Sequence, residues 1–185
     1  MKYDLGLLTE DEAKALARAE ASPGPGFKTA REEPVTLVTT SGGDVVAFLR
    51  LPPLRAGQES PPEDLVEKLS RTIRAERKNA RLVVALSDWG WTAEREYLAQ
   101  HADAVPDILL GSGWGSGVDG RLESDMRCLW VRPYDRGRTL SEVRLFAWPD
   151  RSGKSAWKSK DAATTASLPL GDQYVDNPDV SALFR

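Results

Sequence analysis

The sequence predicts an α/β fold that contains a βαβ unit. Two short, almost wholly apolar segments, Arg81–Leu86 and Asp107–Leu110, flank a segment of helical composition at Ala93–Ala102. Apolar runs of this length are typical of strands that are covered on both faces of a sheet. Because the connections are short, we expect the two strands to be parallel neighbours with the helix packed between them.

A helix and a hairpin are expected before this unit. Thr9 and Glu12 have the spacing of a capping box, so a helix is predicted to begin there and to run to about Glu20. The β-rich segments Val35–Thr40 and Val45–Leu51 flank a Ser-Gly-Gly-Asp turn. This arrangement predicts two antiparallel strands.

A second helix is predicted over Glu63–Lys78, because acidic residues open this segment and basic residues close it. Leu65, Leu69 and Ile73 recur at four-residue spacing and should form its buried stripe. The helix of the βαβ unit is expected to have Thr92 as its N-cap.

Two further strands are predicted at Cys128–Arg132 and Leu140–Ala147. The polar segment Pro149–Leu168 is rich in Ala, Ser, Thr and Lys, which indicates a mobile or extended surface arm. We therefore divide the chain into a main domain at residues 1–148 and a polar arm and C-terminal segment at 149–185 that belong to the same domain.

Composition indicates a soluble, globular protein. The 185 residues are 41% hydrophobic and 29% charged, and the net charge is −3. Mixed charges argue against nucleic-acid binding, which needs a concentrated basic face. No apolar run reaches membrane-spanning length. The N-terminus lacks the apolar stretch of a secretory signal, so either the protein is cytoplasmic or this start is not the native one. The localisation therefore stays open.

The counts of cysteine and histidine exclude several metal and haem sites. Cys128 and His101 are each the sole residue of their type. Zinc fingers, CxxCH haem sites and multi-histidine metal cages are therefore excluded. A Ser-His-Asp triad would depend on His101 alone, and a single helical histidine is more often a polar surface residue.

The candidate site lies in two loops at the ends of the strands of the βαβ unit. Ser87–Trp91 and the glycine-rich Gly111–Gly117 follow neighbouring parallel strands, so they should lie side by side, where α/β folds bind ligands. The glycine-rich loop offers backbone N–H groups to an anion, although a tight turn is the simpler interpretation. Asp88 is a candidate metal ligand or general base, and a turn or capping aspartate is the simpler alternative.

The order of these motifs resembles the later part of the catalytic domain of bacterial 5′-nucleotidase-type, calcineurin-like metallophosphoesterases. In that family a strand ends in Ser-His-x-Gly, a Pro-(Gly-Ile)-Asp segment follows a helix, and a second strand ends in Gly-Gly-His-x-His. The similar segments here are Leu86–Gly90, Val105–Asp107 and Leu110–Gly115. The N-terminal segment, Met1–Glu12, is similar to the family's motif Tyr-Asp-x-x-x-x-Gly-Asn-His-Glu. The resemblance implies part of a two-sheet sandwich with flanking helices.

The departures from the family pattern remove its metal ligands. Glu10 stands in place of the catalytic-site Asn, and Asp11 in place of its His. Asp88 replaces a metal-binding His, and Gly113 and Gly115 replace the two histidines of the last motif. The family's first metal motif and bridging Asp have no counterpart in this chain. Two-metal hydrolysis needs a pair of closely held ions, so the resemblance implies a pseudoenzyme.

We therefore expect a catalytically inactive, metallophosphoesterase-derived domain with a binding or assembly role, and no catalytic residue, metal or cofactor. The degenerate or ligand-binding site would comprise Glu10, Asp11, Asp88, Trp89, Gly113, Trp114 and Gly115. If Trp89 and Trp114 fill the volume that metals once occupied, both indoles should be buried. The family is usually exported, whereas this sequence carries no export signal.

Two alternatives stay open. A metal-dependent phosphoesterase, completed by a missing N-terminal segment or a partner, would need Glu10, Asp11 and Asp88 to converge around Mg²⁺ or Mn²⁺. In the other, the two loops bind a phosphate-bearing ligand without cleaving it, with Arg136 and Arg138 adding charge or forming only a solvated turn. In the resembled family, the residues that have no counterpart here form central strands of one sheet, so without them a sheet edge or an apolar face would stay uncovered. We therefore expect either self-association, or another protein subunit as partner, or a chain that is a piece of a longer protein.

Overall fold

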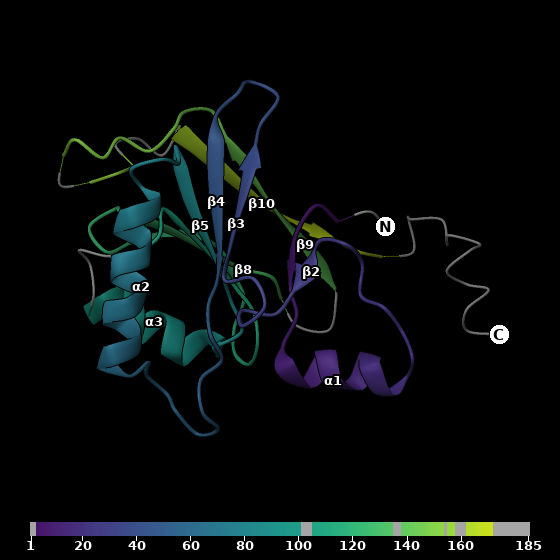
Figure 1. The fold of residues 1–185 in the computed structure, drawn as a ribbon. Helices are drawn as coiled ribbons and strands as arrows, with labels where there is room; N and C mark the ends of the chain where they lie inside the picture. Colours follow the sequence, from purple (N-terminus) through teal and green to yellow (C-terminus); the bar gives the residue numbers. More distant parts are fainter. Residues whose placement is uncertain (1–2, 101–104, 135–137, 154, 158–161, 172–185) are drawn as a thin grey trace.

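A mixed six-stranded sheet forms the centre of the computed structural model, which describes residues 3–100, 105–134, 138–153, 155–157 and 162–171. Its strand order is β3-β4-β5-β6-β8-β7. The strands span, in chain order, β3 Val35–Thr39, β4 Val45–Arg50, β5 Leu82–Ser87, β6 Ile108–Gly111, β7 Val118–Glu123 and β8 Cys128–Arg132. The middle four are parallel, while β3 and β7 run antiparallel to their neighbours at the two edges (Figure 1). The predicted α/β class is confirmed.

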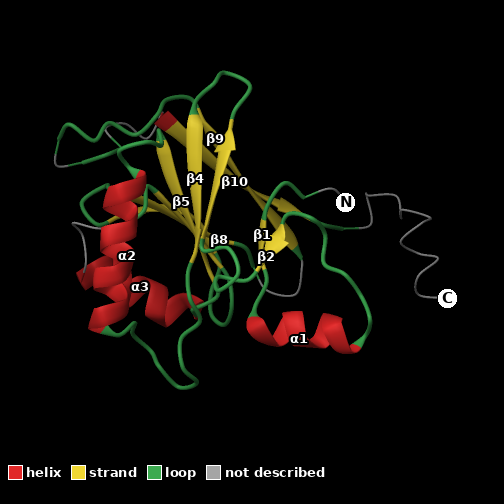
Figure 2. Ribbon diagram, viewed as in Figure 1, coloured by secondary structure: helices red, strands yellow, loops and turns green. Residues whose placement is uncertain are grey.

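The predicted βαβ unit and hairpin are present. β5 and β6 pair in parallel around α3, Gly90–Gln100, and β3 pairs with β4 across the expected turn. Helix α2, Glu63–Glu76, packs beside α3 on one face of the sheet (Figure 2). Leu69 and Ile73 are buried as predicted, and Val66 joins them, whereas Leu65 is only half-buried.

The second face of the sheet is covered by the C-terminal part of the chain. Ala156 and Trp157 pack against residues of β4, β5, β6 and β8. Strands β9, Thr139–Leu145, and β10, Ala163–Pro169, form a separate antiparallel ribbon whose Val143 and Leu145 join the same cluster. The expected mobile or extended surface arm over 149–168 is therefore wrong at Ala156 and Trp157, which are buried, whereas β10 is extended and buries no residue.

The N-terminal part joins the sheet through a buried arginine. Helix α1, Glu10–Arg18, begins at the predicted Thr9–Glu12 capping box and buries no residue. Before and after it, β1, Gly6–Leu7, pairs with β2, Phe27–Lys28. The guanidinium of Arg50, which is 2% exposed, donates to the carbonyl oxygens of Gly6 and Gly26 at 2.7 and 3.1 Å.

Several local expectations differ from the structure or fall outside its described part. Helix α3 begins at Gly90, so Thr92 lies inside it and is not its N-cap. Strand β7 and the short β1–β2 pair were not predicted. His101 and Arg136 lie outside the described residues. No helix in the described ranges is both long and apolar enough to cross a membrane.

Candidate functional site

The two candidate loops lie side by side at the carboxyl edge of the parallel strands, as predicted. The backbone N–H of Gly90 donates to the carbonyl oxygen of Ser112 at 3.2 Å, and the backbone N–H of Trp91 donates to the carbonyl oxygen of Trp114 at 2.8 Å. The hydroxyl of Ser112 donates to the carbonyl oxygen of Ser87 at 2.8 Å. The N–H groups of the first two residues of α3, which at other helix N-termini are available to bind anions, are therefore bound to the glycine-rich loop.

A buried ion pair supports the glycine-rich loop from below. Glu94 of α3 and Arg132 at the end of β8 are 0% and 1% exposed, and Arg132 Nη1 lies 2.6 Å from Glu94 Oε2. The indole of Trp130 also donates to this oxygen, at 2.9 Å. Burial raises the pKa of Glu94, and the charge of Arg132 partly opposes that shift.

Arg132 also binds the loop directly. Its guanidinium donates to the carbonyl oxygens of Gly113, Trp114 and Ser116, at 3.1, 3.2 and 3.1 Å. Three loop carbonyls thus point inward to one cation, which fixes the loop onto the sheet. The charges at this edge therefore hold the backbone in place and are not directed toward an open site.

The two glycines at the family's histidine positions are needed for this packing. Gly113 has φ +79°, and a Cβ there would lie 2.6 Å from the carbonyl oxygen of Asp88. Gly115 has φ +114°, and a Cβ there would collide with Cβ of Trp91. Both positions also have a backbone conformation that other residues rarely adopt. A side chain at either position would therefore require the loops to separate.

The three candidate carboxylates do not converge. Glu10 and Asp88 line one small cavity of about 10 Å³, whereas Asp11 is exposed and pairs with Lys14 at 3.4 Å. Burial raises the pKa of Asp88, and the nearby charge of Glu12 adds to the shift. Among the described residues, no group of three or more His, Cys, Asp and Glu side chains could hold a metal ion. The convergence required by the hydrolase alternative is absent from this part of the chain.

The tryptophans of the two loops differ from one another. Trp89 is 9% exposed, and its indole donates to the carbonyl oxygen of Pro52 at 2.7 Å. Trp114 is 94% exposed, so the expected burial of both indoles was wrong for this residue. Its carbonyl group is fixed by Trp91 and Arg132, and the side chain points away from the packed loops. Trp89 therefore fills the interior, whereas Trp114 lies on the surface.

Glu94 and Arg132 were not among the predicted site residues, although the sequence around each gives a recognisable signal. Glu94 precedes Tyr97 and Leu98 by three and four positions, so it lies on the apolar stripe of α3. Arg132 ends a strand in which every residue is buried. A charge at each of these positions needs a buried partner of opposite sign.

Comparison with known proteins gives little further information. No family model matches the chain, and no curated protein matches it. One solved structure, that of a hypothetical protein from Thermus thermophilus, is similar with a TM-score of 0.49 and 16% sequence identity. The match covers 91% of this chain and 77% of that chain. A likeness of this degree carries no inference about activity.

Proposed function

We propose that this chain is a catalytically inactive domain, derived from a metallophosphoesterase two-sheet sandwich, that acts in protein assembly. The observation that carries the proposal is the closed packing of the two carboxyl-edge loops. Gly113 and Gly115 occupy the positions where the resembled family has metal-binding histidines, and here the neighbouring loop leaves no room for a side chain at either one. The residues are suited to closing the site and not to holding ions.

Metal content provides the first test of this proposal. The purified protein would be incubated with Mn²⁺ and Zn²⁺, dialysed, and measured by mass spectrometry. Metal-free protein is expected, because Asp88 and Glu10 alone do not supply a full set of ligands. One or two ions retained per chain, together with phosphatase activity on nucleotides, would contradict the proposal and favour the metal-dependent hydrolase.

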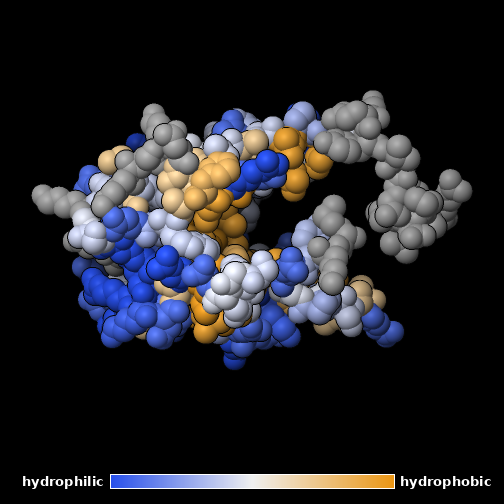
Figure 3. Space-filling model, turned by 90° about the horizontal axis from the view of Figure 1, so that it is seen from above, coloured by the Kyte–Doolittle hydropathy of each residue, from blue (hydrophilic) through white to orange (hydrophobic). Residues whose placement is uncertain are grey.

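An assembly role is supported by apolar surface at two places. Edge strand β3 carries no charge and no proline, pairs only with β4 among the described strands, and exposes 56% of Leu37. Natural proteins usually protect such an edge with charges, prolines or bulges. On the ribbon, Leu140 and Leu168 face each other across β9 and β10 and are 53% and 37% exposed. Seen from above, apolar side chains gather around a hollow in the molecule (Figure 3).

We propose a second copy of this chain as the partner at β3. An uncharged strand centred on Leu37 can pair antiparallel with itself about a two-fold axis, so the same surface serves both copies. Such pairing would place Leu37 opposite Leu37 of the second copy and would extend the sheet across the interface. We therefore expect a dimer with a closed two-fold arrangement.

Light scattering during size-exclusion chromatography tests the assembly role. The wild-type protein should elute as a dimer at micromolar concentration, and Leu37→Lys should elute as a monomer, because a lysine on the edge blocks strand pairing. Trp114→Lys provides the control, since it removes another exposed apolar side chain at a different place. A wild-type monomer, or a Leu37→Lys protein that remains dimeric, would contradict pairing through β3.

A further inference from the structure

The amino edge of the sheet, opposite the two candidate loops, carries a second buried carboxylate. Asp107, which precedes β6, is fully buried. It accepts from the guanidinium of Arg77 at 2.9 Å and from that of Arg151, and it also accepts from the backbone N–H of Val83 at 2.8 Å. One negative charge is thus shared by two arginines, so one positive charge at this edge has no partner within the cluster.

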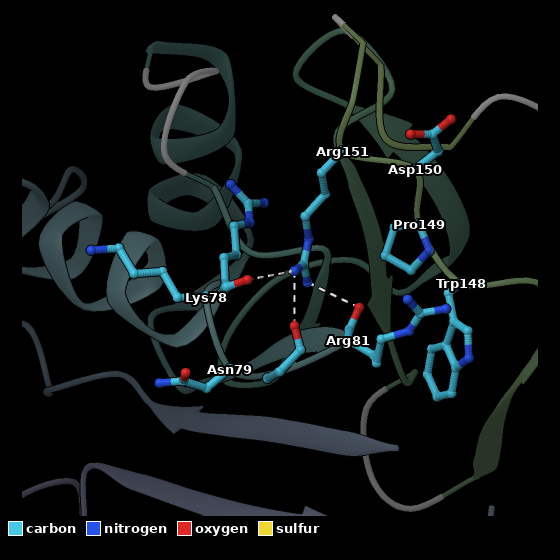
Figure 4. Close-up of a pocket in the computed structure, with 9 residues that line it drawn as sticks. Lys78, Asn79, Arg81, Trp148, Pro149, Asp150 and Arg151 are labelled. Atoms are coloured by element: carbon cyan, nitrogen blue, oxygen red, sulfur yellow. Dashed lines mark hydrogen bonds between the residues drawn. The ribbon is translucent and has the colours of Figure 1, made fainter. Parts of the chain in front are cut away.

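Arg151 also covers the C-terminal end of α2. Its guanidinium donates to the carbonyl oxygens of Arg77, Ala80 and Arg81 at 3.2, 2.9 and 3.0 Å, as the dashed lines in Figure 4 show. The first of these oxygens belongs to the C-cap of α2, while those of Ala80 and Arg81 lie in the turn before β5. With these oxygens bound to a guanidinium, they no longer repel an anion at this place as unpaired carbonyl groups would.

Arg77, Ala80 and Arg151 form part of the wall of a cavity of about 560 Å³. Lys78 and Arg81 also line this cavity. Arg81 is largely exposed, with a 3.4 Å ion pair to Asp44, and such surface pairs contribute little. The Nε atom of Arg77 is buried and has no hydrogen-bond partner in the described structure. Asp150 is the acidic residue of the wall, and its carboxylate accepts from the backbone N–H of Ser152 at 2.8 Å.

An aromatic side chain completes the cavity. Trp148 lies across from Arg81, and the two side chains point toward one another from separate segments of the chain (Figure 4). An indole offers a flat face for a planar ring, and the nearby guanidinium offers a planar donor for phosphate oxygens. The volume lies within the range of small-molecule sites.

We propose that this cavity binds a mononucleotide, with the base against Trp148 and the phosphate held by Arg81 and the surplus charge of the Arg77–Arg151 pair. The site lies at the opposite edge from the closed loops and goes beyond the proposed assembly role. Neither the nucleotide site nor the β3 dimer needs the other to exist. Because the cavity is open to solvent and Asp150 opposes the anion, the affinity should be modest, with a Kd of the order of 0.1 mM.

Isothermal titration calorimetry with AMP, adenosine and inorganic phosphate tests the proposal. AMP should bind saturably, whereas adenosine and phosphate alone should each bind at least about tenfold more weakly, because each retains only half of the contacts. Raising the salt concentration should weaken AMP binding. If AMP shows no saturable binding, or if free phosphate binds as tightly as AMP, the assignment of a nucleotide site is wrong.

Two variants identify the residues involved. Arg81→Ala removes an exposed side chain and should weaken AMP binding about tenfold, while Trp148→Leu should weaken binding of AMP without changing that of phosphate. Arg74→Ala is the matched control, since Arg74 is an exposed arginine of α2 that does not line the cavity. Circular dichroism confirms that each variant is folded. Equal AMP affinity in Arg81→Ala and in the control would overturn the proposed site.

Discussion

Neutralising Glu94 should destabilise the protein strongly, because its partner Arg132 would keep a buried charge. In Glu94→Gln, the amide oxygen can still accept from the Trp130 indole, so that hydrogen bond is preserved. The ion pair with Arg132 is lost, while Arg132 remains 1% exposed and bound to the glycine-rich loop. The substitution therefore isolates the effect of one charge.

The expected cost follows from the surroundings of Arg132. Breaking a buried ion pair by removing one partner typically costs about 3–5 kcal/mol. Three loop carbonyl oxygens continue to accept from Arg132, so we expect a value near the lower limit, about 3 kcal/mol. Removing both charges, as in Glu94→Leu with Arg132→Met, should restore part of this loss, because no unpaired charge then remains.

Urea unfolding followed by circular dichroism measures these differences. Glu96→Gln serves as the control, since Glu96 lies on the same helix near the surface and its neutralisation should change the stability by less than about 0.5 kcal/mol. If Glu94→Gln were as stable as this control, the ion pair would not hold α3 to β8. A double variant that is less stable than Glu94→Gln would also refute the argument, because the loop hydrogen bonds would then outweigh the unpaired charge.

Two further predictions concern glycine strain, compared between the β3–β4 turn and the glycine-rich loop, and Asp88 beside that loop. Gly43→Ala, at φ +85° with open space around it, should cost about 1–2 kcal/mol from backbone strain alone. Gly113→Ala should cost at least about 1 kcal/mol more in the same unfolding experiment, because its Cβ would meet the Asp88 carbonyl oxygen; equal costs would mean that the loops part easily. The pKa of Asp88 is raised in the folded state, so Asp88 contributes a stability that is present below the unfolded pKa and is lost as the pH rises through the folded pKa. Asp88→Asn should therefore flatten the decline in stability above about pH 4, and an unchanged pH profile would contradict the shift.

The elements that the sequence predicts well are those fixed by their own composition. β5 and α2 have short-range patterns that remain valid in the structure, since an apolar run and an amphipathic stripe can each be buried in only one way. β10 is different because Ala163–Pro169 is polar and small. It becomes a strand through its pairing with β9, which no local pattern indicates.

The start of α3 also depends on contacts with a distant part of the chain, which the local sequence does not indicate. Thr92 has the chemistry of an N-cap, yet the helix begins at Gly90. The carbonyl oxygens of Ser112 and Trp114 accept from the first N–H groups of the helix, so a distant loop acts as the cap. The side-by-side arrangement of the two loops was predicted from strand order. The ion pair that fixes them was not, because Glu94 and Arg132 meet only in the folded chain.

Each edge of the sheet has a buried carboxylate paired with arginine, but the number of arginines differs. At the carboxyl edge, one arginine faces one buried carboxylate, and its remaining donors bind loop carbonyl oxygens. The two charges balance there, and the loops close over the site. At the amino edge, Arg77 and Arg151 share Asp107, so the charges do not balance, and the cavity beside them stays open. The proposed anion site does not depend on the closed loops at the other edge, and ligand screening should begin at Arg81 and Trp148.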